Sequence, residues 1–113
     1  MADTSIDSDT LAYVAAGAKY LDETSPDWAL YMNSRELDMS DGEYCVLGQY
    51  HGDYFTGLNV RKLSHDDAHD YGFSVLTAAG FEGSEYWDTY DEWTQLTYMW
   101  RDEIAKRLAV HVL

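Results

Sequence analysis

The sequence has few of the residues on which several classes of protein depend. Its 113 residues include one cysteine, Cys45, one proline, Pro26, and seven lysine and arginine residues. A single cysteine cannot form an intramolecular disulfide, which excludes a disulfide-stapled secreted scaffold and indicates a cytoplasmic protein. Residues 1–10 are acidic and polar where a signal peptide would have a basic start and an apolar stretch. We therefore do not expect secretion.

Long hydrophobic runs are also missing. The longest nearly apolar run, Leu11 to Ala18, is less than half of the roughly 20 residues that a helix needs to span a bilayer. The sequence therefore predicts no membrane segment.

Basic residues are scarce beside the acidic ones. Aspartate and glutamate number 21, which gives a formal net charge of −14. Nucleic-acid binding through phosphate neutralisation needs clustered basic side chains, so we expect no direct nucleic-acid partner. Docking on an anionic membrane is disfavoured for the same reason.

What the sequence does contain is apolar and aromatic side chains. Hydrophobic residues make up 46% of the chain and aromatic residues 15%, which is too much for an acidic disordered tail. The length fits one core, so we expect residues 1–113 to form a single domain whose first few residues are disordered.

Helical periodicity is clear near the N-terminus. Apolar residues recur at steps of three and four over 11–21, which predicts a helix from Ser8 to Asp22. Ser25 followed by Pro26 is typical of a new helix start, and we expect a short helix that runs to about Met32.

The central segment allows two interpretations. The spacing of Ser40 and Glu43 is that of a capping box, which predicts a helix over 41–58. The residues expected on one side of that helix are Tyr44, Leu47, His51, Tyr54, Phe55 and Leu58. Three glycines weaken such a helix, and His51-Gly52-Asp53 fits the turn of a short hairpin over 44–60, which remains the alternative.

The last part of the chain is again helical in pattern. Ser64 caps a short predicted helix from His65 to Tyr71, which Gly72 ends, and a loop over 73–83 follows, with a short extended piece at 73–76. A long amphipathic helix is predicted from Ser84 to Ala109. Its expected inward residues are Tyr86, Tyr90, Trp93, Thr97, Trp100, Ile104 and Leu108. The fold class is therefore mostly α, a small single-domain helical bundle.

Several short motifs resemble a known group of proteins. They are Gly17-Ala-Lys-Tyr-Leu-Asp22, Trp28-Ala, Leu37-Asp-Met-Ser40, Cys45-Val-Leu-Gly-Gln49, Gly52-Asp-Tyr54 and Trp100-Arg-Asp-Glu-Ile104. Together they cover about half of the chain and resemble small acidic proteins of unknown function from actinobacteria and their phages. The resemblance implies a phage or prophage accessory protein. A second cysteine common in that group would fall at Gly42, so the resemblance supports no thiol pair here.

Histidine and cysteine are the two residue types that suggest a chemical site. His65 and His69 are four residues apart on one predicted helical face, the spacing that metalloproteases use for zinc, but no third ligand is fixed by spacing. Solvated histidines are the preferred interpretation, and we assign no metal, cofactor or catalytic residue. Cys45 has apolar neighbours and no basic residue nearby, which indicates a buried, inert thiol inside a helix.

The charge pattern suggests the function. We expect a non-enzymatic interaction protein of phage type that binds and modulates or inhibits a host or defence protein with a basic surface; DNA mimicry is the sharpest form of this hypothesis. The expected partner-binding residues lie on the outer face of the last helix: Trp87, Asp88, Asp91, Tyr98 and Asp102. The alternatives are a metal-dependent hydrolase that uses His65 and His69, and an acidic structural or assembly component. The oligomeric state stays open.

The first prediction concerns salt. A net charge of −14 on so small a chain should destabilise the folded state more than the expanded one, and salt screens this repulsion. We expect the melting temperature to rise as sodium chloride goes from low to physiological concentration, measured by circular dichroism. A flat or falling response would contradict this and would mean that the acidic groups are paired locally.

Overall fold

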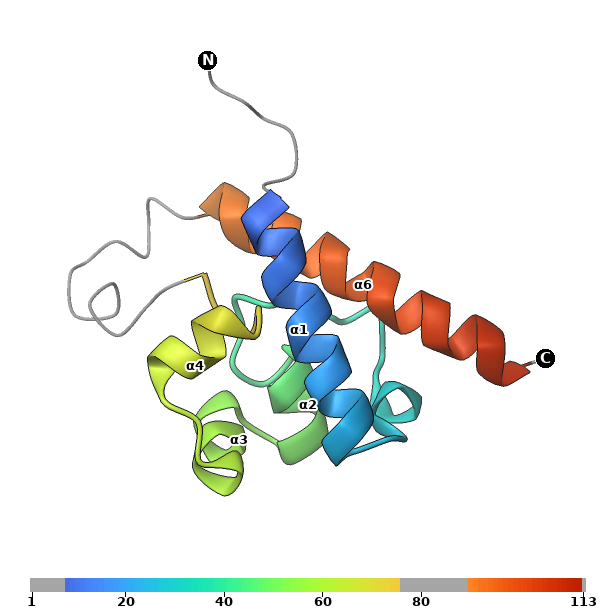
Figure 1. The fold of residues 1–113 in the computed structure, drawn as a ribbon, viewed down its shortest axis with the longest axis horizontal. Helices are drawn as coiled ribbons and strands as arrows, with labels where there is room; N and C mark the ends of the chain where they lie inside the picture. Colours follow the sequence, from blue (N-terminus) through green and yellow to red (C-terminus); the bar gives the residue numbers. More distant parts are fainter. Residues whose placement is uncertain (1–7, 76–89, 113) are drawn as a thin grey trace, which may run out of the picture.

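The computed structural model describes residues 8–75 and 90–112, with side chains over 9–75 and 91–109. The helices are α1 (Ser8–Thr24), the 3-10 turn η1 (Trp28–Tyr31), α2 (Val46–His51), α3 (Tyr54–Arg61), α4 (His65–Asp70) and α6 (Tyr90–Val112). Helix α1 crosses α6, and the short helices α2, α3 and α4 gather on one side of this pair (Figure 1). The described residues contain no strand, so the predicted mostly helical bundle with a long C-terminal helix is confirmed.

Two helices form close to where the sequence predicts them. Helix α1 begins at Ser8 and ends at Thr24, two residues beyond the expected end. At α4, the Ser64 hydroxyl accepts from the Asp67 amide at 3.0 Å while the Asp67 carboxylate accepts from the Ser64 amide at 3.0 Å. This reciprocal cap and the left-handed Gly72, with φ of 70°, bound the helix as predicted.

The single helix predicted over 41–58 is wrong. Gly52 adopts a φ of 95° and ends α2, after which the Asp53 carboxylate accepts from the amides of Phe55 and Thr56 and begins α3. The alternative hairpin over 44–60 is also wrong, because both arms are helical. A glycine in the left-handed conformation and a strong N-cap, placed side by side, break the helix that the periodicity alone would continue.

The capping box predicted at Ser40 and Glu43 does not form. The Ser40 amide and hydroxyl instead donate hydrogen bonds to the Asp38 carboxylate, at 3.0 and 2.6 Å. The Ser40 hydroxyl therefore caps no helix. Helix α2 begins only after Cys45, whose sulfur accepts from the Gly48 amide at 3.2 Å. The loop over 38–45 is therefore a series of turns.

The short helix predicted after Ser25 and Pro26 is reduced to the single turn η1. Asp27, rather than Ser25, occupies the N-cap position, and its side chain makes no capping bond. Trp28 begins the turn, is fully buried, and donates its indole N–H to the Asp22 carboxylate at 2.9 Å. Burial of this indole fixes the turn where helical propensity alone does not.

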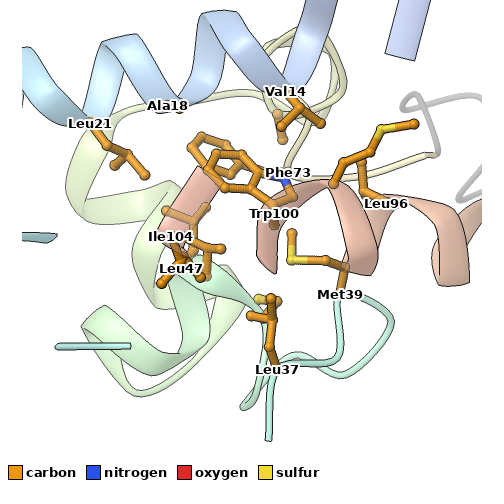
Figure 2. Close-up of a cluster of buried hydrophobic side chains, with 14 of the residues drawn as sticks. Val14, Ala18, Leu21, Leu37, Met39, Leu47, Phe73, Leu96, Trp100 and Ile104 are labelled. Atoms are coloured by element: carbon orange, nitrogen blue, oxygen red, sulfur yellow. The ribbon is translucent and has the colours of Figure 1, made fainter. Parts of the chain in front are cut away.

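The core is centred on Trp100 of α6 (Figure 2). The Trp100 ring is fully buried, stacks on Phe73 with centroids 5.4 Å apart, and meets the edge of Trp28 at 5.7 Å. Its indole N–H donates to the Gly72 carbonyl at 2.6 Å. One side chain thus joins α6, η1 and the end of α4, with Val14, Ala18 and Leu21 of α1 packed into the same cluster.

Helix α6 buries a wider stripe than the sequence predicts. Trp93, Thr97, Trp100 and Ile104 are buried as expected and Leu108 is half-buried, but Leu96 and Met99 are also buried. The stripe is wide because α6 packs against two neighbours. Leu96 and Met99 lie beside α1, and the loop before α2 covers the other side, where the Met39 amide donates to the Thr97 hydroxyl at 2.9 Å. The predicted start at Ser84 and the inward Tyr86 lie outside the described residues, as does most of the loop over 73–83; the Tyr90 side chain is likewise not described.

Two glycines allow α4 and α1 to approach each other closely. A methyl group on Gly17 would collide with the Tyr71 carbonyl oxygen, and one on Gly72 would lie 2.7 Å from the Val14 Cα. Because backbone stands on the other side in both cases, neither contact could relax by a side-chain rotation.

We expect Gly17→Ala to lower the free energy of unfolding by about 1–3 kcal/mol, because the added methyl overpacks this crossing. At a helix position with room for the methyl group, the same change would raise the free energy of unfolding by about 1 kcal/mol, because alanine favours the helix more than glycine does. Urea unfolding measures the sign. The control is Ala16→Gly, on the exposed side of α1, which should cost only about 1 kcal/mol. A stabilised Gly17→Ala variant would refute the close crossing of α1 and α4.

Candidate interaction surface

A groove of about 340 Å³ lies between α1 and α6. Its lining combines apolar and polar side chains from the two helices: Leu11, Val14, Gln95, Tyr98, Met99, Asp102, Glu103 and Lys106. Val14 and Met99 are buried and form the apolar floor, whereas the charged residues all come from α6. The groove is thus an apolar trough with one charged edge.

Two large apolar side chains of the groove remain exposed. Leu11 is 46% exposed and Tyr98 is 62% exposed. The Arg101 guanidinium lies 5.7 Å from the centre of the Tyr98 ring, while its N–H groups donate to the carbonyls of Ser34 and Leu37. Because Arg101 is anchored on both carbonyls, it holds one side of the Tyr98 ring and leaves the rest of the ring at the edge of the groove.

The charged edge of the groove is mostly negative. Glu103 is paired with Arg107 at 2.7 Å and with Lys106 at 3.4 Å. Asp102 is exposed, and its carboxylate forms no hydrogen bond or ion pair with another described residue. A cation brought by a partner would therefore find the Asp102 carboxylate available.

One end of the helix pair is closed by Arg107. Its guanidinium grips both oxygens of the Asp22 carboxylate, at 2.8 and 2.7 Å, and lies over the Trp28 ring at 5.4 Å. The hydrogen bond from Arg107 holds the pKa of Asp22 below its usual value, against the opposing effect of burial. This bidentate pair fixes the distance between α1 and α6 beside the groove.

The structure places three of the five predicted partner-binding residues. Asp91, Tyr98 and Asp102 are exposed on α6 and lie within about 40° of one another around the helix axis. Trp87 and Asp88 lie outside the described residues. The sequence did not predict the opposite wall: Leu11 belongs to the apolar stripe over 11–21, but it is exposed whereas Val14 of the same stripe is buried.

The two candidate metal ligands, His65 and His69, contact different parts of the molecule. His65 packs against the Phe55 ring with centroids 6.0 Å apart. His69 instead packs against the Tyr13 ring at 5.0 Å, and its Nδ1 is 3.2 Å from the Asp70 carboxylate. Within the described parts of the chain, no three histidine, cysteine, aspartate or glutamate side chains are placed to hold a metal ion.

Cys45 is buried, as predicted, but at the N-cap of α2 rather than inside a helix. Burial raises the pKa of its thiol to about 11, and the amide of Gly48 only partly opposes this. The thiol is therefore protonated at neutral pH and is a poor nucleophile.

A second arginine, Arg61 at the end of α3, is surrounded by neutral partners. It donates to the hydroxyls of Thr24 and Ser25 at 3.0 and 2.8 Å and lies 5.5 Å from the ring centres of Tyr20 and Tyr50. Within the described residues, no carboxylate forms an ion pair with Arg61. The guanidinium thus ties the end of α1 to α3 through hydroxyl groups and aromatic faces.

The Arg61 guanidinium also contributes to the protonation state of His51. Its Nε donates to His51 Nε2 at 2.9 Å, which requires that nitrogen to be unprotonated. Burial, and then the charge of Arg61, lower the pKa of His51 below its usual value of 6.5. His51 is therefore neutral in the folded protein at neutral pH.

Comparisons with protein-family models, with curated proteins and with solved structures each found no match. In the part of the chain that the structure describes, no helix combines the length and the apolar character needed to cross a membrane.

The low pKa of His51 predicts a pH dependence. In the unfolded chain His51 binds a proton at about pH 6.5, whereas in the folded chain it does not. The contribution of neutral His51 to the free energy of unfolding is therefore complete above that pH. This contribution is lost as the pH falls toward the pKa of His51 in the folded protein. We expect His51→Gln, which still accepts from Arg61 but cannot titrate, to lose less melting temperature than wild type between about pH 7.5 and 5.5. Equal losses in both proteins would contradict the lowered pKa of His51.

Proposed function

We propose that this protein is an acidic, non-enzymatic interaction module that binds a basic protein through the groove between α1 and α6. The observation that carries the proposal is the exposure of Leu11 and Tyr98 at an apolar groove in a chain of net charge −14. Tyr31 and Val60 are equally exposed, but Leu11 and Tyr98 stand together at a groove, and such a grouping is typical of a binding site.

The groove offers both parts of a protein interface. An aromatic ring already held on one side, as Tyr98 is by Arg101, loses little conformational freedom on binding and is the kind of residue that forms a hot spot. The surrounding negative field raises the rate of encounter with a basic partner and disfavours acidic ones. Apolar contact then supplies the affinity that screened surface charges do not.

The chemistry of the groove describes the partner. It is a protein segment with an apolar side chain that fits between Leu11 and Tyr98, next to a lysine or arginine that reaches Asp102. The resemblance to phage-type acidic proteins supports a host or defence protein as the source of that segment, and inhibition or modulation as the result.

The groove favours this proposal over the others considered from the sequence. DNA mimicry uses rows of carboxylates and needs no apolar anchor, and three basic residues, Arg101, Lys106 and Arg107, interrupt the acids of α6. A purely structural or solubility role gives no reason for Leu11 and Tyr98 to stand exposed at a groove. A hydrolase based on His65 and His69 has no third ligand within the described residues.

The test compares capture by matched variants from a lysate of the host cell. We expect Tyr98→Ala to keep the melting temperature and to weaken binding of the captured basic protein about tenfold or more, as loss of a hot spot does. Tyr31→Ala is the control, because Tyr31 is equally exposed but lies on η1 away from the groove. Asp102→Asn should slow association at low salt and lose this effect at high salt.

Two results would refute the proposal. One is a partner that binds wild type and Tyr98→Ala equally well. The other is a partner with an acidic surface whose association does not depend on salt. Purified components and a binding-rate measurement distinguish these results from the expected one.

A further inference from the structure

A second cavity, of about 190 Å³, lies between the loop before α2, the start of α3 and α6. Its lining is mainly apolar and aromatic: Met39, Ser40, Gly42, Cys45, Tyr54, Phe55 and Trp93. Trp93 and Tyr98 are five residues apart on α6, so they point about 140° apart around the helix axis. The cavity is therefore separate from the groove of the proposed function.

Three aromatic rings form much of the wall. Trp93 and Tyr54 are buried, and Phe55 stands at the rim, 57% exposed. The rings of Tyr54 and Phe55 are 5.1 Å apart and inclined at 76°, so the two faces are nearly perpendicular. Met39 and Cys45 add polarisable sulfur. An apolar protein cavity of roughly 150 Å³ already holds a benzene-sized molecule, so a compact organic group fits here.

The wall is built from a strongly acidic segment. All the lining residues except Trp93 lie within 36–58, which contains five carboxylates and no lysine or arginine. These are Glu36, Asp38, Asp41, Glu43 and Asp53. None of the five forms an ion pair with another described residue. Backbone amides instead hold Asp38, Asp41 and Asp53, which keeps their charge uncompensated near the cavity.

The polar atoms of the wall determine which cation fits. The Gly42 carbonyl already accepts from the Tyr54 amide at 2.7 Å, and the Ser40 hydroxyl already donates to Asp38. A primary ammonium group would give up its water here and gain few acceptors in return. A trimethylammonium group has no N–H to satisfy, and aromatic faces attract it directly.

We propose that this cavity binds a trimethylammonium group, with the rings of Trp93, Tyr54 and Phe55 around the cation and the acidic segment 36–58 supplying the field. The group could reach the cavity on a small quaternary ammonium compound or on a trimethylated lysine side chain. The proposal needs no protein partner and does not depend on the groove between α1 and α6.

The experiment titrates the full chain at constant ionic strength with choline chloride and with 3,3-dimethyl-1-butanol, the uncharged analogue of the same shape. The chemical shift of the Trp93 indole N–H, assigned with Trp93→Phe, reports binding. We expect a saturable shift and about fivefold or greater preference for choline, the range of a cation held by aromatic faces. A parallel titration with Nα-acetyl-trimethyllysine amide identifies the source, since the tighter of the two cations is the better match.

Matched variants separate the cation site from a merely apolar hole. Phe55→Leu keeps apolar bulk at the exposed rim but removes the ring face. It should therefore weaken choline binding severalfold and leave the binding of 3,3-dimethyl-1-butanol almost unchanged. Val60→Leu, also exposed on α3 but outside the cavity, is its control. Asp41→Asn keeps the oxygen that accepts from the Glu43 amide, so it should weaken the binding of choline but not of the uncharged analogue. Asp27→Asn, at an exposed position, is the control and should not weaken choline binding.

Three results would overturn the proposal. The first is equal binding of choline and its uncharged analogue, which would show an apolar hole without cation recognition. The second is a choline shift that does not saturate or that Phe55→Leu leaves unchanged. The third is a loss of choline binding in Val60→Leu as large as that in Phe55→Leu.

Discussion

The hydrogen bond from the Trp100 indole to the Gly72 carbonyl is the contact from which the rest of the packing can be derived. It requires the chain after α4 to pass directly beneath α1, which is possible only because Gly17 and Gly72 present no side chains at that crossing. With Trp100 held there, Phe73 and Trp28 pack on two sides of the same ring. The core is therefore ordered by one large residue and two small ones.

Three arginines connect this core to the surface, and each uses different chemistry. Arg61 holds hydroxyl groups and tyrosine rings, Arg101 holds two backbone carbonyls, and Arg107 holds a carboxylate and an indole. Each spans two elements, so basic residues that are scarce in the sequence serve the fold rather than the outer charge.

Local signals predicted more of this structure than long-range ones did. Ser64 and Gly72 were recognised because the chemistry of a helix end depends on residues a few positions apart. The break at Gly52 was misread because the same glycine fits a weak helix, a hairpin turn or a helix end, and only its neighbours in space decide. At the candidate site, helix periodicity placed Tyr98 and Asp102 on one face, but no periodicity shows that Leu11 lies across from them.

The position of Cys45 has a further consequence. Its thiol is buried, is protonated at neutral pH, and accepts the hydrogen bond that begins α2. A thiol-reactive reagent too large to enter the cavity that Cys45 lines can therefore modify it only while this corner of the molecule is open. As the chain has one cysteine, the rate of modification gives the free energy of that local opening without any engineered label. The protein carries its own probe of how often the wall beside α2 comes apart.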